Sequence, residues 1–103
     1  MRKIDIESSK AFNGGYDFKS SNTSVKTDPW GVYMYLHDHC IAKKVYGDGT
    51  YLSHCDWETT TTKARLNGIL SMYQDKSIYQ KDFQWYLRDG DKTIEFTDGW
   101  NKI

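Results

Sequence analysis

The middle third of the chain alternates between apolar and polar residues, with the two-residue period that is typical of β-strands. Three segments are rich in β-branched and aromatic residues and are separated by short polar stretches: residues 32–36, 41–46 and 50–55. Asp38 and His39 predict a two-residue turn between the first two segments, because Asp tolerates the left-handed backbone region. The Gly-Asp-Gly sequence at residues 47–49 predicts the second turn. We therefore expect residues 31–57 to form a three-stranded antiparallel meander.

A helical pattern follows the meander. Apolar residues recur at positions i, i+3, i+4 and i+7 and form one face of the predicted helix: Leu66, Ile69, Leu70 and Tyr73. Threonine is a favoured N-cap residue, and Thr60 or Thr61 is the expected N-cap. Gly68 lies inside the helix, where glycine costs about 1 kcal/mol relative to alanine, which indicates close packing against the sheet. We expect this helix within residues 58–74.

The two ends of the chain complete the predicted fold. Residues 78–97 contain strand-like segments whose apolar side chains are expected to face inward: Phe83, Trp85, Leu87, Ile94 and Phe96. Residues 1–30 are dominated by serine, asparagine and glycine and predict an irregular segment, with a short helical turn at residues 9–12 and an edge strand at residues 22–25. The sequence thus predicts one α+β domain over residues 1–103: an antiparallel sheet of five or six strands with a single helix packed on one face.

Charge and composition narrow the classes of function. The chain has 14 basic and 14 acidic residues, whereas proteins that bind nucleic acid through bulk electrostatic attraction are usually basic. A protein that imitates DNA would need a large acidic excess. A local charged patch is still compatible with this balance. Aromatic residues make up 16% of the chain, and its eight tyrosines suit both half-buried sheet faces and binding surfaces.

Three sequence strings resemble a known family. They are Tyr-Leu-His at residues 35–37 before a short turn, W-x-T-x-T-T-x-x-R-L-N-G at residues 57–68, and Y-Q-K-x-F-x-W-Y-L at residues 79–87. Over roughly residues 20–100 the chain resembles a family of small proteins of bacteriophages and prophages. The resemblance implies an accessory protein that acts in the cytoplasm of the infected bacterial host, and it supplies no catalytic residues. Where relatives have Gly-Asn after Tyr-Leu-His, this chain has Asp38-His39 followed by Cys40.

The histidines and cysteines raise the possibility of a metal site or a catalytic thiol. The meander brings His37, Cys40, His54 and Cys55 to one end of the sheet, and four nitrogen or sulfur ligands are what tetrahedral zinc requires. Against this, the chain lacks C-x-x-C and H-x-x-x-H spacings, and neighbouring strand residues such as His54 and Cys55 point to opposite faces. With no apolar leader after Met1, we expect no signal peptide, no membrane span and reduced thiols. We predict no metal and no cofactor.

The same residue types allow a thiol–imidazole catalytic pair, with Cys40 or Cys55 beside a histidine and Asp56. The family resemblance argues against this pair, because the relatives lack the set. We therefore predict a protein that binds and does not catalyse.

The start of the predicted helix is a candidate anion or nucleic-acid site. Backbone N–H groups and threonine hydroxyls at residues 59–62 are followed by Lys63 and Arg65. Trp57, Tyr35 and Tyr86 are candidates to stack on bases. The alternative is that the threonines only cap the helix and that Arg65 pairs with a neighbouring carboxylate, either Asp56 or Glu58.

A protein-binding surface is the remaining hypothesis. The core is not expected to hide all 16 aromatic residues, and Tyr, Trp and Arg are the residue types that anchor protein interfaces. We predict docking on a host protein or protein–nucleic-acid complex, in a counter-defence role: inhibition of a host immune effector such as a CRISPR nuclease complex, or sequestration of its signal. The alternative is a nucleic-acid-binding modulator of transcription or replication.

Overall fold

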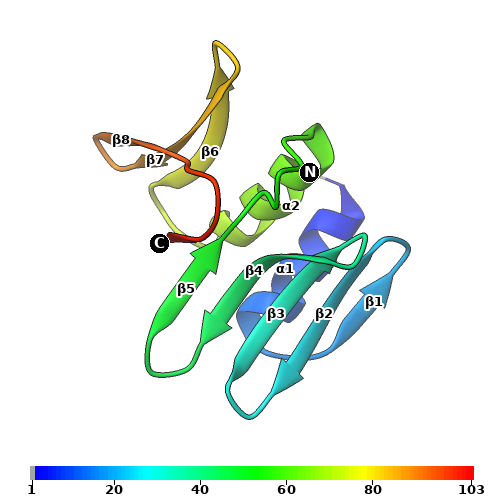
Figure 1. The fold of residues 1–103 in the computed structure, drawn as a ribbon. Coiled ribbons are helices and arrows are strands. Elements are labelled where there is room, and N and C mark those ends of the chain that lie inside the picture. Colours follow the sequence, from blue (N-terminus) through cyan, green and yellow to red (C-terminus); the bar gives the residue numbers. More distant parts are fainter. Residues whose placement is uncertain (1) are drawn as a thin grey trace.

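Two helices lie on one side of a six-stranded antiparallel sheet, and a three-stranded sheet stands beside them (Figure 1). The computed structural model describes residues 2–103. The larger sheet contains β1 (Phe18–Ser20), β2 (Thr23–Asp28), β3 (Gly31–Leu36), β4 (His39–Val45), β5 (Gly49–Leu52) and β9 (Asn101–Lys102), in that order. The smaller sheet contains β6 (Lys76–Lys81), β7 (Gln84–Asp89) and β8 (Lys92–Glu95). The helices are α1 (Lys3–Gly14) and α2 (Thr60–Leu70). Neither helix has the length and apolar character needed to cross a membrane.

This architecture confirms the predicted α+β class and the β3–β4–β5 meander. The strands divide into two sheets, however, because β9 returns to pair with β5 and leaves β6, β7 and β8 as a separate unit. The first tight turn is also one residue earlier than predicted. Leu36 pairs with His39, so His37 and Asp38 occupy the turn with φ of 50° and 66°. A bulge between the pairs of Met34 and Tyr35 shifts the register by one residue.

The prediction of an irregular segment at residues 1–30 is wrong, because α1 covers most of its first half and β1 and β2 cover much of its second half. The buried positions of α1 are largely polar and include Asp5, Ser8 and Ser9. Such a face carries no apolar stripe that a sequence pattern could detect. This helix is stabilised by its contact with α2, where Arg65 forms a buried ion pair with Asp5.

Gly68 is where the two helices approach most closely. A Cβ atom built on Gly68 would lie 2.8 Å from the backbone carbonyl oxygen of Asp5 and 3.5 Å from the Cβ of Ser9. The glycine therefore packs against α1. The sequence had suggested packing against the sheet, and that expectation is wrong. The N-cap of α2 is Thr59, one residue before the predicted positions, and its hydroxyl accepts the N–H of Thr62 at 3.1 Å.

The core confirms most of the predicted inward face. Six of these apolar side chains are buried: Leu66, Ile69, Leu70, Trp85, Leu87 and Phe96. Phe83 and Ile94 are corrections, since they are 92% and 47% exposed. Phe83 does not continue the alternation of β7 because it sits in the two-residue turn before that strand, with φ of 67°. Ile94 lies opposite Leu87 on β8, which is an edge strand.

The close approach at Gly68 predicts that Gly68→Ala destabilises the protein. Helix propensity alone would favour alanine by about 1 kcal/mol, but the added methyl must displace the α1 backbone, and overpacking of this kind costs about 1–3 kcal/mol. Urea unfolding monitored by circular dichroism measures the change. Ala64→Gly in the same helix is the control and should cost about 1 kcal/mol through propensity. A more stable Gly68→Ala protein would contradict the close packing.

Candidate binding surfaces

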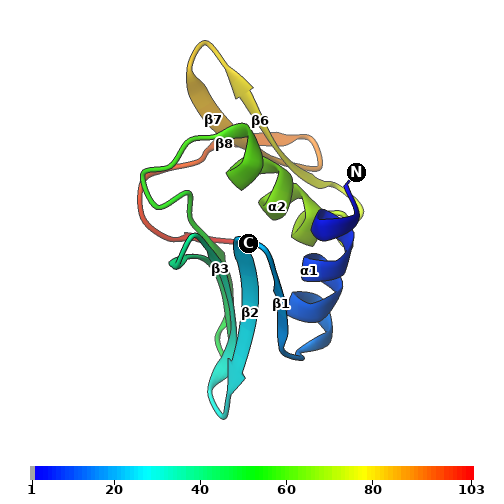
Figure 2. The same cartoon turned by 90° about the vertical axis from the view of Figure 1, so that its right-hand side faces the viewer.

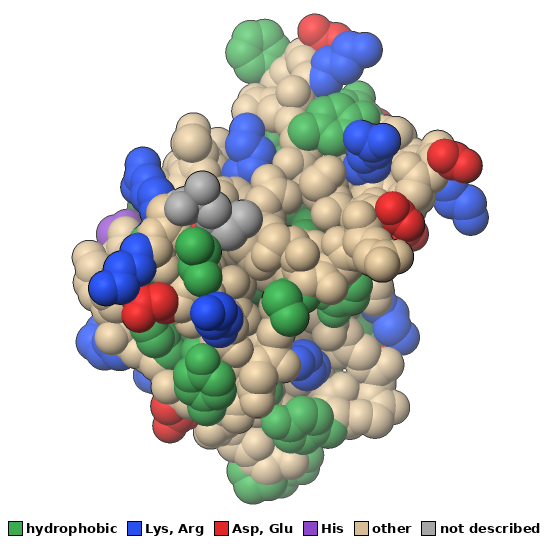
Figure 3. All heavy atoms as spheres, turned by 180° about the vertical axis from the view of Figure 1, so that it is seen from behind, with side chains coloured by type: hydrophobic (Ala, Val, Ile, Leu, Met, Phe, Trp, Pro, Cys, Tyr) green, Lys and Arg blue, Asp and Glu red, His purple; other side chains and the backbone are tan. Residues whose placement is uncertain are grey.

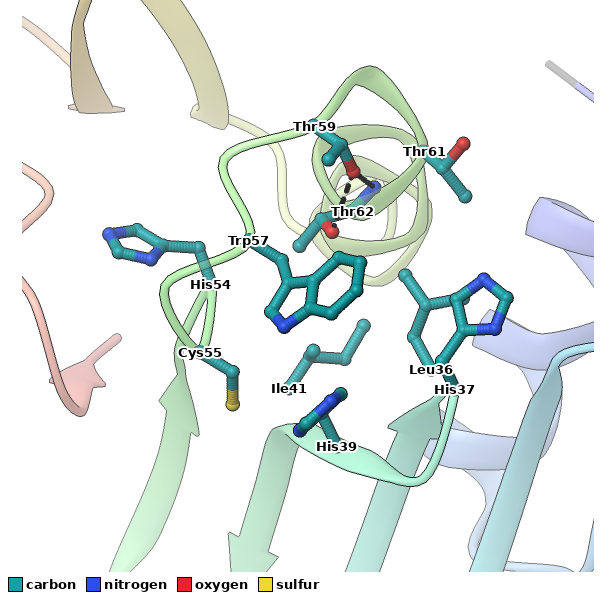
Figure 4. Close-up of a pocket in the computed structure, with 10 residues that line it drawn as sticks. All are labelled: Leu36, His37, His39, Ile41, His54, Cys55, Trp57, Thr59, Thr61 and Thr62. Atoms are coloured by element: carbon teal, nitrogen blue, oxygen red, sulfur yellow. Dashed lines mark hydrogen bonds between the residues drawn. The ribbon is translucent and has the colours of Figure 1, made fainter.

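A small pocket lies between the β3–β4 turn and the start of α2 (Figure 4). Its volume is about 170 Å³, and its lining combines apolar side chains, imidazoles and threonines: Leu36, His37, His39, Ile41, His54, Cys55, Trp57, Thr59, Thr61 and Thr62. The indole of Trp57 lies among these side chains and is 48% exposed. Its ring centroid is 5.4 Å from that of His39 and 6.3 Å from that of His37.

The backbone after β5 places Trp57 over this pocket. Cys55 and Asp56 are consecutive non-glycine residues with φ of 50° and 61°, a conformation that L-residues rarely adopt. The N–H of Asp56 donates to Nδ1 of His54 at 3.0 Å, which helps to hold the turn. The hydroxyl of Thr59 then caps α2. From the sequence, the threonines either cap the helix or bind an anion. In the structure Thr59 caps α2, and it lines the pocket together with Thr61 and Thr62.

The pocket has the size of one amino-acid side chain. Small-molecule sites usually have volumes of about 300–1,000 Å³, so a cavity of about 170 Å³ would not enclose a drug-sized ligand. The imidazoles and hydroxyls around it are suited to hydrogen bonds with a polar tip.

The five residues proposed from the sequence as binding residues lie on different parts of the structure. Trp57 borders the pocket. Lys63 is partly buried, with its Nζ 5.9 Å from the ring centroid of Trp85. Tyr35 is on β3, and Tyr86 is on β7. They do not form one continuous site.

Of these five residues, Arg65 differs most from its predicted position. Its side chain is 3% exposed and forms an ion pair with Asp5, which is also buried, in place of the expected Asp56 or Glu58. Its Nε donates to the hydroxyl of Thr23 at 3.0 Å. The guanidinium is thus held inside the protein between α1, α2 and β2, away from the surface that a ligand would meet.

The two thiols lie close together and interact with backbone carbonyl groups. Cys55 Sγ donates to the carbonyl oxygen of Cys40 at 2.7 Å, and Cys40 Sγ donates to the carbonyl oxygen of Ala42 at 3.4 Å. Both cysteines are free. Burial raises the pKa of the Cys40 thiol to about 11, and the nearby Cys55 adds to this rise, whereas backbone N–H donation from Ala42 and the positive charge of Lys43 oppose it. A thiol with this pKa is a poor nucleophile at neutral pH.

His54 also lines the pocket, but its ring makes different contacts from those of His37 and His39. Its ring packs against Trp85 and Phe96, with centroid distances of 5.5 and 5.8 Å. Nδ1 accepts the N–H of Asp56, so Nε2 carries the proton and lies 3.2 Å from the Asp98 carboxylate. Within residues 2–103, one group of three or more His, Cys, Asp or Glu side chains has all its ligand-type atoms within 4.8 Å of one another: His54, Asp56 and Asp98. The proposed set of His37, Cys40, His54 and Cys55 does not meet that distance.

The hairpin of β6 and β7 carries a surface that the sequence did not reveal. In Figures 1 and 2 this hairpin projects beyond the rest of the molecule. Lys81 pairs with Gln84, so Asp82 and Phe83 form the turn, and both have positive φ. Tyr79 and Tyr86 pair across the strands, with ring centroids 5.5 Å apart. The next cross-strand pair with the same orientation includes Arg88.

We call Tyr79, Phe83, Tyr86 and Arg88 the hairpin surface. The sequence spacing could have predicted that Phe83 lies in a turn. Two residues between paired strands form a tight turn whatever their hydrophobicity.

Sequence comparison places these features in a phage family. The family described as Kyanoviridae Gp96 protein matches residues 1–102. The chain belongs to this family. Membership confirms the resemblance to small bacteriophage proteins and extends it over α1. No curated protein and no solved structure matches the chain. The assignment of a function to this Kyanoviridae Gp96 family member therefore depends on the surfaces themselves.

The buried ion pair predicts a strong and non-additive effect of mutation. Asp5→Asn keeps the shape of the side chain but leaves the Arg65 guanidinium buried without a counter-charge, which should cost about 3–5 kcal/mol of unfolding free energy. Combining Asp5→Leu with Arg65→Met removes both charges and should cost less than Asp5→Asn alone. Urea denaturation of the variants gives the values. A double variant that is less stable than Asp5→Asn would contradict a buried ion pair.

The position of Cys40 predicts slow thiol chemistry. In a Cys55→Ser variant, Cys40 is the single thiol and should react with a disulfide reagent more slowly than after denaturation, because burial still holds its pKa above the ordinary value of 9.0. Below both pKa values each unit lowers the thiolate fraction tenfold, and the native rate should rise with pH until the pH approaches 11. Cys40→Ser reports on Cys55 separately. Equal native and denatured rates for Cys40 would refute its burial.

Proposed function

We propose that this phage protein acts without catalysis, by docking on a protein of the infected host cell. Its site of action is the host cytoplasm, and its role is counter-defence, in which it blocks a host immune effector such as a CRISPR nuclease complex. The observation that carries the docking proposal is the position of Phe83 at the tip of the projecting β6–β7 hairpin.

Phe83 is unfavourable in the isolated protein in two ways. Its φ of 67° belongs to the left-handed region, which costs an L-residue roughly 1–2 kcal/mol and is unusual for a bulky side chain. Its side chain is 92% exposed, so it contributes almost nothing to the core. Asp-Gly is the preferred sequence for such a turn, and glycine at position 83 would remove the strain. A complementary apolar pocket on a partner would recover the lost burial of the ring.

Other residues of the same hairpin support a protein partner. The hairpin surface combines phenylalanine, two stacked tyrosines and Arg88, and aromatic residues and arginine are enriched in the cores of protein interfaces. The pocket beside Trp57 has space for one partner side chain. Its small volume favours docking over sequestration of a small-molecule signal.

The counter-defence role rests on the phage family and on the small size of the chain. A phage protein that acts by occupying a surface of a host effector needs no catalytic group, and a projecting apolar residue offers a direct way to occupy such a surface.

Phe83→Gly provides a test in which stability and binding change in opposite directions. The variant should be equally stable or more stable in urea, by up to about 1 kcal/mol, because glycine adopts positive φ freely. It should lose capture of the host protein that the wild type retains from nuclease-treated lysate, identified by mass spectrometry and confirmed with purified components. Trp30→Ala is the matched control, because Trp30 is 71% exposed and lies in the β2–β3 turn at the opposite end of the molecule (Figure 1).

Two results would reject the proposal. One is unchanged capture of the purified host protein by Phe83→Gly. The other is loss of all capture by the wild type after nuclease treatment, which would leave nucleic acid as the partner.

A further inference from the structure

The face of the six-stranded sheet that the helices leave open carries an alternating row of lysine and tyrosine. Figure 2 shows both helices on one side of this sheet. On the other side, strand register aligns one residue from each of β2, β3, β4, β5 and β9: Lys26, Tyr33, Lys43, Tyr51 and Lys102. Each residue pairs directly with the next across the sheet. We call these five residues the lysine–tyrosine row.

Other basic and aromatic side chains extend the row. Lys19 pairs with Ser24, which pairs with Tyr35, in a second line on the same face. Lys26 Nζ lies 5.4 Å from the ring centroid of Tyr35. Trp100 precedes β9, and its ring centroid is 4.4 Å from Lys43 Nζ. The open face therefore combines four lysines with four aromatic rings.

The positive charge of this face is only partly neutralised. Asp48 accepts the hydroxyl of Tyr51 at 2.8 Å and pairs with Lys102 at 3.4 Å, and these contacts lower the pKa of its carboxyl. Among residues 2–103, no carboxylate lies within 4.0 Å of the ammonium groups of Lys19, Lys26 or Lys43. On the opposite side of the molecule, basic and acidic side chains lie among separate hydrophobic side chains (Figure 3).

We infer that the lysine–tyrosine row and the adjacent Tyr35 and Trp100 bind single-stranded nucleic acid, DNA or RNA. The lysines would neutralise backbone phosphates, and the aromatic rings would stack on unpaired bases. This combination of a basic surface and stacking platforms is the general mode of single-strand binding. The site is distinct from the hairpin surface and does not depend on it.

Binding would exchange the lysine–ring contacts of the free protein for base–ring stacking, and the relative strengths of these contacts favour that exchange. An ammonium group over an exposed ring contributes roughly 2- to 5-fold in an equilibrium constant. A base stacked on an aromatic side chain contributes roughly 5- to 150-fold in affinity. Lys26 and Lys43 can therefore leave the ring faces for phosphates when bases arrive. Bases within a duplex already stack on their neighbours, so a duplex would gain only the charge contacts.

Fluorescence anisotropy with labelled oligo-dT, oligo-U and a DNA duplex tests the inference with the full chain. Both single strands, or one of them, should bind more tightly than the duplex, and affinity should fall with salt. Tyr51→Leu and Tyr35→Leu should each weaken single-strand binding roughly 5- to 150-fold, whereas Tyr51→Phe should retain it because the ring remains. Lys43→Gln should reduce the slope of log affinity against log salt by about 0.7.

Matched variants away from the face are the controls. One control is Tyr16→Leu, since Tyr16 lies just after α1 and is 52% exposed. The other is Lys10→Gln, since Lys10 lies within α1. Neither should change single-strand affinity. Thermal unfolding of each variant identifies any that fail to fold, and Tyr51→Phe and Lys43→Gln test the ring and the charge with the smallest structural change.

The inference is overturned if the wild type binds neither single strand at low salt. It is also overturned if the duplex binds as tightly as both single strands, or if folded Tyr51→Leu and Tyr35→Leu bind like the wild type. Different affinities for oligo-dT and oligo-U would support single-strand binding and identify the preferred sugar.

Discussion

The buried ion pair between Arg65 and Asp5 constrains how the two helices sit in the fold. Two charges that are almost fully removed from water are tolerated only when they meet, and separating them would leave an uncompensated charge inside the protein. The pair joins residues of α1 and α2 that are 60 positions apart in sequence, and Arg65 also donates to Thr23 on β2. Because Gly68 allows the helix backbones to approach, the pair can form without opening a gap between α1 and α2.

This constraint decides which surfaces remain open. Both helices are held on one side of the six-stranded sheet, so the lysine–tyrosine row stays uncovered (Figure 2). The three-stranded sheet is attached through α2 and the chain that leaves it: the side-chain amide of Asn67 bonds both backbone groups of Ile78, at 2.7 and 2.9 Å. His54 packs with Trp85 and Phe96 on the other side of this junction. The β6–β7 hairpin is fixed at its base and free at its tip.

Local patterns predict the parts of this fold that bury apolar faces. The β3–β4–β5 meander, α2 and the C-terminal strands follow from alternation and from the 3.6-residue period. In contrast, α1 buries Asp5, Ser8 and Ser9, and the reason for their burial lies in a helix far along the chain. The shift of the first turn has a similar origin, since a one-residue bulge leaves no mark in the pattern of hydrophobicity.

The candidate sites were harder to predict for related reasons. Charge usually indicates exposure, and Arg65 breaks that rule because its partner is Asp5. Hydrophobicity usually indicates burial, and Phe83 breaks that rule because strand register places it in a turn. The lysine–tyrosine row cannot be read from one strand, since its members are contributed one at a time by five strands. Only the register of the whole sheet brings them together.

The two proposed binding surfaces would reinforce each other on a nucleoprotein target. The lysine–tyrosine row has few lysines, and the protein has no net charge. Binding of single strands by this row alone therefore has a shallow salt dependence and a modest affinity. A single exposed phenylalanine at a hairpin tip also provides one anchor and not a full interface. When both are carried by one small domain, binding at the first surface makes the second event intramolecular, and the combined affinity can exceed either one by orders of magnitude. A complex in which a host protein holds an unpaired strand would meet both surfaces at once, whereas free protein or free nucleic acid would meet only one.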